Sequence, residues 1–284
     1  MELIFEIAKF VFYVGLIVWI SKNVLVKTLR NLAENLKLKP KTVGDVAGIA
    51  TSIPELLTIS VSSIHGFASA SIYNVLSSNI INLIQYGATI IINKNQKTLK
   101  NKAIKTDIFL VLITIILPAL FLAIKTDFQI AVVPVFILLY FGFKKINDNA
   151  HKLYLKNEDR KIEQTLEKED RWERGNKSKV IKNVVILIIV GILLFVIGNF
   201  LGDTIESLCT KFGIQEFVVG IILGFTTSLP ELITFLESQK HYKKGSNEIL
   251  GVVEATNNLL MSNILNLFII QSIGILLFYF ATNI

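Results

Sequence analysis

Histidine, cysteine and charge are all scarce in this chain of 284 residues. Its single cysteine, Cys209, excludes an internal disulfide and a cysteine-based zinc cluster, so we expect it to act as a small hydrophobic residue. The three histidines, His65, His151 and His241, show no metal-ligand spacing, and each is expected at a surface or membrane interface. Only 18% of the residues are charged, against roughly 25% in soluble domains. This scarcity excludes a disordered chain, a nucleic-acid-binding tail and an ordinary soluble enzyme.

Hydrophobic residues are abundant instead, at 52% of the chain, and the mean hydropathy is +0.58. A bilayer core requires about 20 mostly apolar residues per helix, and eight stretches qualify. They are residues 3–21, 42–65, 70–92, 106–124, 128–144, 181–201, 216–237 and 249–280. The N-terminus lacks a basic region followed by a small-residue cleavage site, so no removable signal peptide is expected. The sequence therefore predicts an all-α, multi-pass protein of the cell membrane, surrounded by lipid.

The net charge of +7 predicts the orientation of the protein rather than an anionic partner. Of the 29 Lys and Arg residues, 26 lie in four loops, 22–41, 94–105, 144–182 and 240–244, which share one side if the eight spans alternate. Because cytoplasmic loops carry the basic excess, we expect the 144–182 loop in the cytoplasm and both termini outside. Within this scheme, residues 23–39 and 203–213 are expected as short amphipathic interfacial segments.

The chain contains an internal repeat. Residues 42–58 read TVGDVAGIATSIPELLT and residues 218–234 read VVGIILGFTTSLPELIT, and nine of the seventeen positions match. Each half continues to a second matching block, NVLSSNIIN at 74–82 and NLLMSNILN at 258–266. Five predicted spans precede the second copy, so the two copies enter the membrane from opposite sides. Inverted repeats of this kind place a substrate site near the membrane midplane.

This repeat predicts three parts of the chain. They are a first inverted repeat of five spans at 1–145 with its motif at 44–82, a connecting loop at 146–180, and a second repeat of three spans at 181–284 with its motif at 220–266.

The repeated motif brings oxygen atoms into the membrane. Pro54 lacks an amide hydrogen and disturbs the helix around it, and Glu55 adds a carboxylate next to it. Pro230 and Glu231 repeat the arrangement in the second half. An intramembrane carboxylate is costly, so two at equivalent positions indicate function. Two carboxylates among hydroxyls and amides, without thiolate or imidazole, favour a hard cation such as Ca²⁺.

The blocks TSIPEL with SSNIIN and TSLPEL with MSNILN resemble the two alpha-repeats of the cation/Ca²⁺ exchanger superfamily, especially the prokaryotic sodium/calcium exchangers. The resemblance covers about residues 1 to 280 and implies antiport by alternating access, with Ca²⁺ and Na⁺ competing for overlapping sites and no cofactor. It implies that Glu55 and Glu231 are the central carboxylates. The further ligands that it implies are Gly48, Thr51, Ser52, Ser78 and Asn82 in the first half and Gly224, Thr227, Ser228, Ser262 and Asn266 in the second.

The sequence departs from that family in four ways. Asn266 stands where several relatives carry Asp, and Ala50 and Ser77 replace glycines that are usual in the family. Glu254 is an additional acid on the helical face of Asn258, Ser262 and Asn266, either an accessory third carboxylate or a solvated residue near a helix end. The two last helices of the family are missing, so we expect lipid or a second copy in a homo-oligomer to cover that flank.

Three functions therefore remain open from the sequence. The first is an antiporter that exchanges Ca²⁺ for Na⁺. The second is a Ca²⁺/H⁺ antiporter, because two desolvated carboxylates close together attract protons in competition with cations. The third is a membrane cation sensor or assembly subunit that binds without transport. No enzymatic activity is expected.

Overall fold

The computed structural model describes residues 1–28, 31–32, 38–124, 130–154, 177–243 and 248–282, and all regular structure in these residues is helical. Seven helical segments among them are long and apolar enough to cross a membrane. They are Glu2–Val26, Pro40–Ile64, Ala68–Ile92, Lys102–Ala123, Ile181–Lys211, Glu216–Lys240 and Ile249–Thr282. The predicted all-α membrane fold is therefore confirmed.

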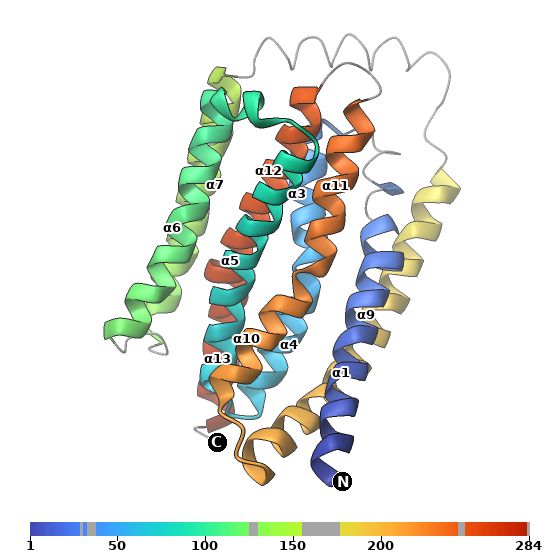
Figure 1. The fold of residues 1–284 in the computed structure, drawn as a ribbon, viewed down its shortest axis with the longest axis vertical. Coiled ribbons are helices and arrows are strands. Elements are labelled where there is room, and N and C mark those ends of the chain that lie inside the picture. Colours follow the sequence, from blue (N-terminus) through green and yellow to red (C-terminus); the bar gives the residue numbers. More distant parts are fainter. Residues whose placement is uncertain (29–30, 33–37, 125–129, 155–176, 244–247, 283–284) are drawn as a thin grey trace.

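The eighth predicted span falls in helix α7, Val132–Tyr154, which is not one of these seven segments. The first half of α7 is apolar, but Lys144, Lys145 and Asp148 follow in its second half. With three charges so close, no long stretch of this helix has the composition of a bilayer core. The helix nevertheless packs along α6, Lys102–Ile124, from end to end of the bundle (Figure 1).

The helices form a central group with a helix pair on each side (Figure 1). On one side α1, Glu2–Ile20, packs against α9, Lys177–Glu206, and on the other side α6 packs against α7. The central group consists of α3 (Pro40–Thr51), α4 (Ile53–Ile64), α5 (Ala68–Ile92), α10 (Glu216–Thr227), α11 (Leu229–Lys243), α12 (Glu248–Ile264) and α13 (Gln271–Thr282). A π-helical segment, Leu265–Ile270, joins α12 to α13.

The two halves of the central group interlock rather than stand apart. Helix α3 of the first half packs against α12 of the second, and α10 of the second half packs against α5 of the first. Helices α3 and α10 begin at opposite ends of the bundle, as inverted repeats require (Figure 1). We call the end at which α3, α6 and α12 begin the basic end, because described lysines gather there, among them Lys41, Lys97, Lys100 and Lys102. Helix α1 begins and α13 ends at the opposite end (Figure 1).

Parts of the two segments predicted to lie in the membrane interface, residues 23–26 and 203–211, instead continue spanning helices. Helix α1 continues into a π-helical segment, Ser21–Val26, while residues 29–30 and 33–37 lie outside the described residues. Helix α9 likewise continues into a π-helical segment, Ser207–Lys211. Both extensions bury apolar side chains, Leu25 and Leu208, against the rest of the bundle, so packing keeps them in line with the spans.

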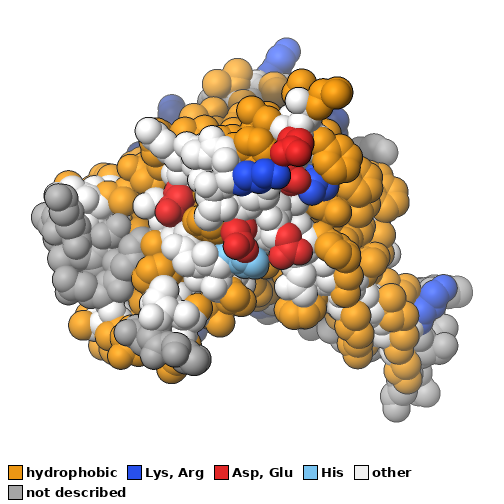
Figure 2. All heavy atoms as spheres, turned by 90° about the horizontal axis from the view of Figure 1, so that it is seen from below, with side chains coloured by type: hydrophobic (Ala, Val, Ile, Leu, Met, Phe, Trp, Pro, Cys, Tyr) orange, Lys and Arg blue, Asp and Glu red, His pale blue; other side chains and the backbone are white. Residues whose placement is uncertain are grey.

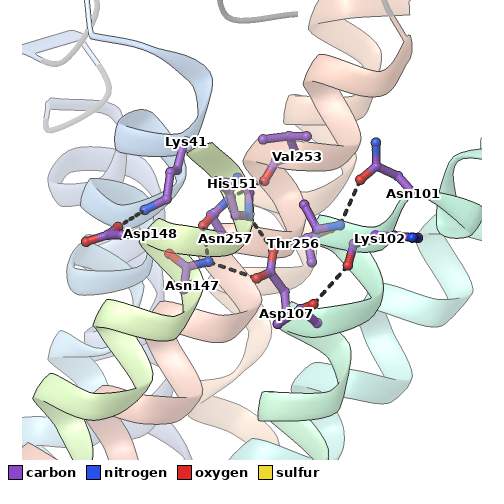
Figure 3. Close-up of polar contacts among 12 residues, drawn as sticks. Lys41, Asn101, Lys102, Asp107, Asn147, Asp148, His151, Val253, Thr256 and Asn257 are labelled. Carbon is purple, nitrogen blue, oxygen red and sulfur yellow. Dashed lines mark hydrogen bonds and ion pairs between the residues drawn. The ribbon is translucent and has the colours of Figure 1, made fainter. Parts of the chain in front are cut away.

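A buried polar cluster near the basic end joins α6, α7 and α12 (Figure 3). Asp107 of α6 accepts a hydrogen bond from Asn147 Nδ2 at 2.8 Å, and its other oxygen lies 2.7 Å from His151 Nε2. Asn147 also donates to Asn257 Oδ1 of α12 at 3.1 Å. The prediction of a surface or interfacial position is wrong for His151, because its side chain is buried. The partner that buries it, Asp107, lies 44 residues earlier in the chain.

Beside this cluster, ion pairs connect α3 to the polar half of α7. Lys41 Nζ lies 2.7 Å from Asp148 Oδ1 (Figure 3), and Lys144 pairs with Asp45. Partial burial alone raises the pKa of the Asp148 carboxyl, but the Lys41 ammonium outweighs it and holds that pKa below its usual value. The ionised pair therefore persists at neutral pH and fixes α7 against the central group.

We expect Asp107→Ala to destabilise the protein by about 1–3 kcal/mol, because it removes the buried partner of His151 Nε2 and one of the two acceptors of the Asn147 amide. The measurement is the midpoint of thermal unfolding in detergent. Thr106→Val is the matched control, since Thr106 is only half-buried and its hydroxyl donates within its own helix, to the Lys102 carbonyl at 2.9 Å. Equal midpoints for Asp107→Ala and wild type would contradict this account of the cluster.

Candidate functional site

Two helix breaks create the site, one in each half. Helix α3 ends at Thr51 and α4 begins at Ile53, with Ser52 between them; α10 ends at Thr227 and α11 begins at Leu229, with Ser228 between them. Each new half-helix carries its proline in the first turn, where a missing amide hydrogen costs nothing. Each serine hydroxyl turns back to the glycine four residues earlier, with Ser52 Oγ donating to the Gly48 carbonyl at 2.9 Å. The equivalent bond of Ser228 to the Gly224 carbonyl measures 2.8 Å.

The two glutamates lie in the first turns of the half-helices that follow the breaks, and both are fully buried. They are close enough for the charge of Glu231 to act on Glu55. The other predicted ligands surround them, and all are buried. These are Gly48, Thr51, Ser52, Ser78, Asn82, Gly224, Thr227, Ser228, Ser262 and Asn266. The structure thus brings the twelve sequence-predicted ligand positions together within the central group.

Each glutamate has hydroxyls from both halves of the protein around it. Ser262 of the same half donates from its Oγ to Glu231 Oε1 at 3.0 Å, and Thr51 of the first half lies near Glu231. Around Glu55 the corresponding side chains are Ser78 and Thr227, which lie within electrostatic reach although neither meets hydrogen-bond geometry. Each threonine lies near the glutamate of the other half because α3 packs against α12 and α10 packs against α5.

The centre of the site has more acceptor oxygens than donors. Five buried oxygens there accept no hydrogen bond from the described residues. They are both carboxylate oxygens of Glu55, Oε2 of Glu231, and Oδ1 of Asn82 and of Asn266. Both asparagines turn their amide nitrogens elsewhere, Asn82 to Ser262 Oγ at 3.3 Å and Asn266 to Asn79 Oδ1 at 3.4 Å. Buried acceptors without donors are costly, and a hard cation is the species that satisfies several of them at once.

Close helix contact at two glycines holds the halves together. A Cβ atom on Gly48 would lie 2.7 Å from Met261 Cβ and 2.9 Å from the Asn258 carbonyl of α12. A Cβ on Gly224 would lie 2.0 Å from Ser77 Oγ and 2.6 Å from the Asn74 carbonyl of α5. Any larger residue would push each broken helix away from its partner, so the glycines allow the approach that closes the site.

Three polar pairs support the site. Sequence reasoning did not assign a role to them. Asn74 Nδ2 donates to Thr58 Oγ1 at 2.7 Å in the first half, and Asn258 Nδ2 donates to Thr234 Oγ1 in the second. Asn79 and Asn263 exchange bonds across the two halves, each amide nitrogen donating to the other's backbone carbonyl at 3.3 and 3.2 Å. All six residues are matched positions of the two repeats, so the repeat itself contained the signal.

Glu254 is not solvated, because only 2% of its surface is exposed. Ser238 Oγ of α11 donates to its Oε1 at 2.6 Å. His65 keeps an interfacial position, where its Nδ1 lies 2.8 Å from Glu206 Oε2, and the side chain of His241 lies outside the described residues. Among the described residues no three His, Cys, Asp or Glu side chains group as a metal site. The candidate site therefore consists of two carboxylates completed by hydroxyl and amide oxygens.

These features define a class: a multi-pass helical membrane protein in which inverted repeats enclose a buried, oxygen-lined site, as in a cation exchanger. The family described as "Sodium/calcium exchanger protein" matches residues 7–144 and 182–283. The chain belongs to this family, whose members are cation exchangers. No curated protein matches the chain.

The solved structures that match are of the sodium-calcium exchanger NCX_Mj. One, soaked with 10 mM Na⁺ and zero Ca²⁺, has a TM-score of 0.51 at 21% identity, covering 96% of this chain and 83% of that one. Another, soaked with 2.5 mM Na⁺ and 10 mM Sr²⁺, has a TM-score of 0.50 at 22% identity, with the same coverage. At such identities the likeness concerns the fold, which the two proteins share.

Proposed function

We propose that this protein is a secondary-active antiporter that exchanges Ca²⁺ for Na⁺ at the site of Glu55 and Glu231. The observation that carries the proposal is the group of five buried acceptor oxygens without donors, two of them on Glu55. Ca²⁺ takes six to eight oxygen ligands, and two carboxylates balance its charge. The family match and the fold of a sodium-calcium exchanger support this choice of ions.

In this proposal Na⁺ and Ca²⁺ compete for the same oxygens. One Ca²⁺ or two Na⁺ neutralise the two carboxylates, whereas the emptied site leaves two charges buried at close range, which is costly. An exchanger needs this property. When the site is empty, the protein should not readily switch the side of the membrane to which the site opens. The pair α1 and α9 contacts the central group mainly through α4 and α10. We propose that this pair moves along the central group to open the site to one side and then to the other.

The orientation of the protein is part of the proposal, with the basic end in the cytoplasm and both termini outside. The opposite end carries exposed or half-exposed acids and few lysines among the described residues. Seen from that end, acidic side chains gather near the middle of a face rimmed by hydrophobic side chains (Figure 2). An acidic surface around the outer mouth raises the local concentration of cations there.

The test is Ca²⁺ uptake by the full chain in lipid vesicles, with Na⁺, K⁺ and H⁺ gradients imposed separately. We expect an outward Na⁺ gradient to drive Ca²⁺ uptake above its equilibrium level, and an ionophore that collapses this gradient to abolish it. Uptake that only a pH gradient drives would replace the proposal with a Ca²⁺/H⁺ antiporter. Ca²⁺ binding without uptake under any gradient would identify a sensor.

The Ca²⁺/H⁺ antiporter is the second candidate because neither oxygen of Glu55 accepts a hydrogen bond from the described residues. A proton on one of those oxygens would remove one of the two charges that Glu55 and Glu231 carry, and a second proton would remove the other. The two candidates therefore use the same site and differ only in the ion that replaces Ca²⁺.

A further inference from the structure

Two routes lead from the central site to the two ends of the bundle. The inverted repeat relates these routes to each other, but the residues along them differ. Glu254 of α12 corresponds to Ala70 of α5, because both lie eight residues before the serine of the second repeated block. The packing confirms the correspondence. A Cβ atom on Gly44 would lie 2.4 Å from the Glu254 carbonyl, and one on Gly220 would lie 2.4 Å from the Ala70 carbonyl. The same place thus holds a carboxylate near the basic end and a methyl group near the opposite end.

Glu254 lies between the basic end and the central site. Helix α12 begins at Glu248, so Glu254 is six residues inside it and about 12 Å along the axis from Ser262. Its side chain points toward α11, where Ser238 Oγ holds one carboxylate oxygen at 2.6 Å. A carboxylate buried within a membrane segment is costly and marks an ion pathway more often than a structural contact.

Oxygen-bearing side chains continue from Glu254 to the central carboxylates. Asn258 and Ser262 follow at intervals of four residues, on the same face of α12 and about 6 Å apart. Thr51 Oγ1 lies 3.4 Å from Asn258 Oδ1, and Ser262 Oγ donates to Glu231 at 3.0 Å. All of these side chains are buried, so the series forms one internal polar column.

A second group of buried polar side chains flanks this column near the basic end. Gln239, next to Ser238 on α11, donates to Thr89 Oγ1 at 2.9 Å and accepts from Asn95 Nδ2 at 3.0 Å. Asn95 Oδ1 is buried and accepts no hydrogen bond from the described residues. The surroundings of Glu254 thus supply further oxygen ligands for a passing cation.

At the opposite end, the half-exposed Glu216 accepts a hydrogen bond from the Ser69 amide at 3.0 Å. The route that leads inward from there has no buried acid among the described residues. Its buried polar side chains between α4, α5 and α13 are neutral: the hydroxyls of Ser62, Ser63 and Ser71 and the amide of Gln271. Ser62 corresponds to Ser238, so the hydroxyl is present in both routes while the carboxylate is present in one.

We propose that Glu254 and Ser238 form an intermediate binding site for a hard cation, Ca²⁺ above all, on the route from the basic end to Glu231. The proposal rests on the proposed function and adds an asymmetry to it. A cation that enters from the basic end meets a buried carboxylate before the central site, whereas one that enters from the opposite end passes acids only near the surface and then the neutral buried groups named above. The carboxylate concentrates cations along one route and so lowers the Ca²⁺ concentration required on that side.

The test compares Glu254→Gln with wild type in vesicles of both orientations, with the full chain and Ca²⁺ as the probe. Glutamine keeps the shape and an acceptor for Ser238 but removes the charge. We expect the Ca²⁺ concentration for half-maximal uptake from the basic end to rise about tenfold, with the value from the opposite end unchanged. Glu237→Gln is the matched control, because it removes an exposed carboxylate one residue before Ser238 and should change neither value.

Equilibrium Ca²⁺ binding to the purified variant in detergent completes the test, and the central site is expected to keep its wild-type affinity. Three results for Glu254→Gln would overturn the proposal, because Glu254 would then not serve one route alone. They are an equal change in the Ca²⁺ concentration for half-maximal uptake from both ends, no change from either end, and a loss of equilibrium binding at the central site. If wild type itself shows no gradient-driven uptake, the proposed function fails. If wild type transports and Glu254→Gln is indistinguishable from it, only the intermediate site fails.

Discussion

Replacing Glu55 or Glu231 with glutamine is expected to reduce Na⁺-driven Ca²⁺ uptake by about two orders of magnitude or more. Removing one charge from a buried, charged binding group typically costs several kcal/mol, and a tenfold change in affinity corresponds to about 1.4 kcal/mol. Glutamine retains the shape and one acceptor oxygen of each side chain, so the fold should persist. The measurement is initial uptake in vesicles at a Ca²⁺ concentration below wild-type half-saturation, with equilibrium binding in detergent beside it.

Glu2→Gln provides the matched control for both variants. Its carboxylate is exposed at the end where the termini lie and pairs with Lys211 at 3.0 Å, far from the two helix breaks. This control should transport like wild type. Wild-type transport by Glu55→Gln or by Glu231→Gln would show that the replaced residue is not part of the site.

Gly48→Ala and Gly224→Ala are expected to lose both Ca²⁺ binding and thermal stability. The added methyl group would lie 2.7 Å or less from atoms of the partner helix, and relief requires the helices to separate. Overpacking of this kind costs about 1–3 kcal/mol, and it also displaces the hydroxyls that complete the site. The measurements are the midpoint of unfolding in detergent and equilibrium Ca²⁺ binding.

Gly15→Ala tests the same substitution where space is available. Nothing lies within 4 Å of the added Cβ on α1, and alanine favours a helix by about 1 kcal/mol over glycine. This variant should therefore unfold at or above the wild-type temperature. If Gly48→Ala and Gly224→Ala resembled Gly15→Ala, close helix contact would not explain the two glycines.

The sequence predicted the parts of this protein that depend on local chemistry. Pro54 and Pro230 mark the helix breaks, because a proline that lacks its amide hydrogen begins a new helix and does not continue the old one. The polar residues of the repeats predicted which faces turn inward, since intramembrane polar groups avoid lipid. Two carboxylates at matched positions led us to predict a cation site, and that site stays a prediction.

The contacts that the sequence did not predict depend on residues far apart in the chain. His151 is buried because Asp107 meets it from another helix, and nothing near residue 151 indicates this. Glu254 is likewise buried by the approach of α11 rather than by its own surroundings. The exchange of Thr51 and Thr227 between the halves follows from how the repeats interlock, which the periodicity of a single helix does not determine.

The most direct test of the account is the position of a bound divalent cation. Anomalous diffraction from crystals of the full chain soaked with Sr²⁺ should locate the ion between the carboxylates of Glu55 and Glu231, with the hydroxyls of the two helix breaks beside it. Excess Na⁺ should displace it from that position. A divalent cation bound elsewhere, with none between Glu55 and Glu231, would contradict the account.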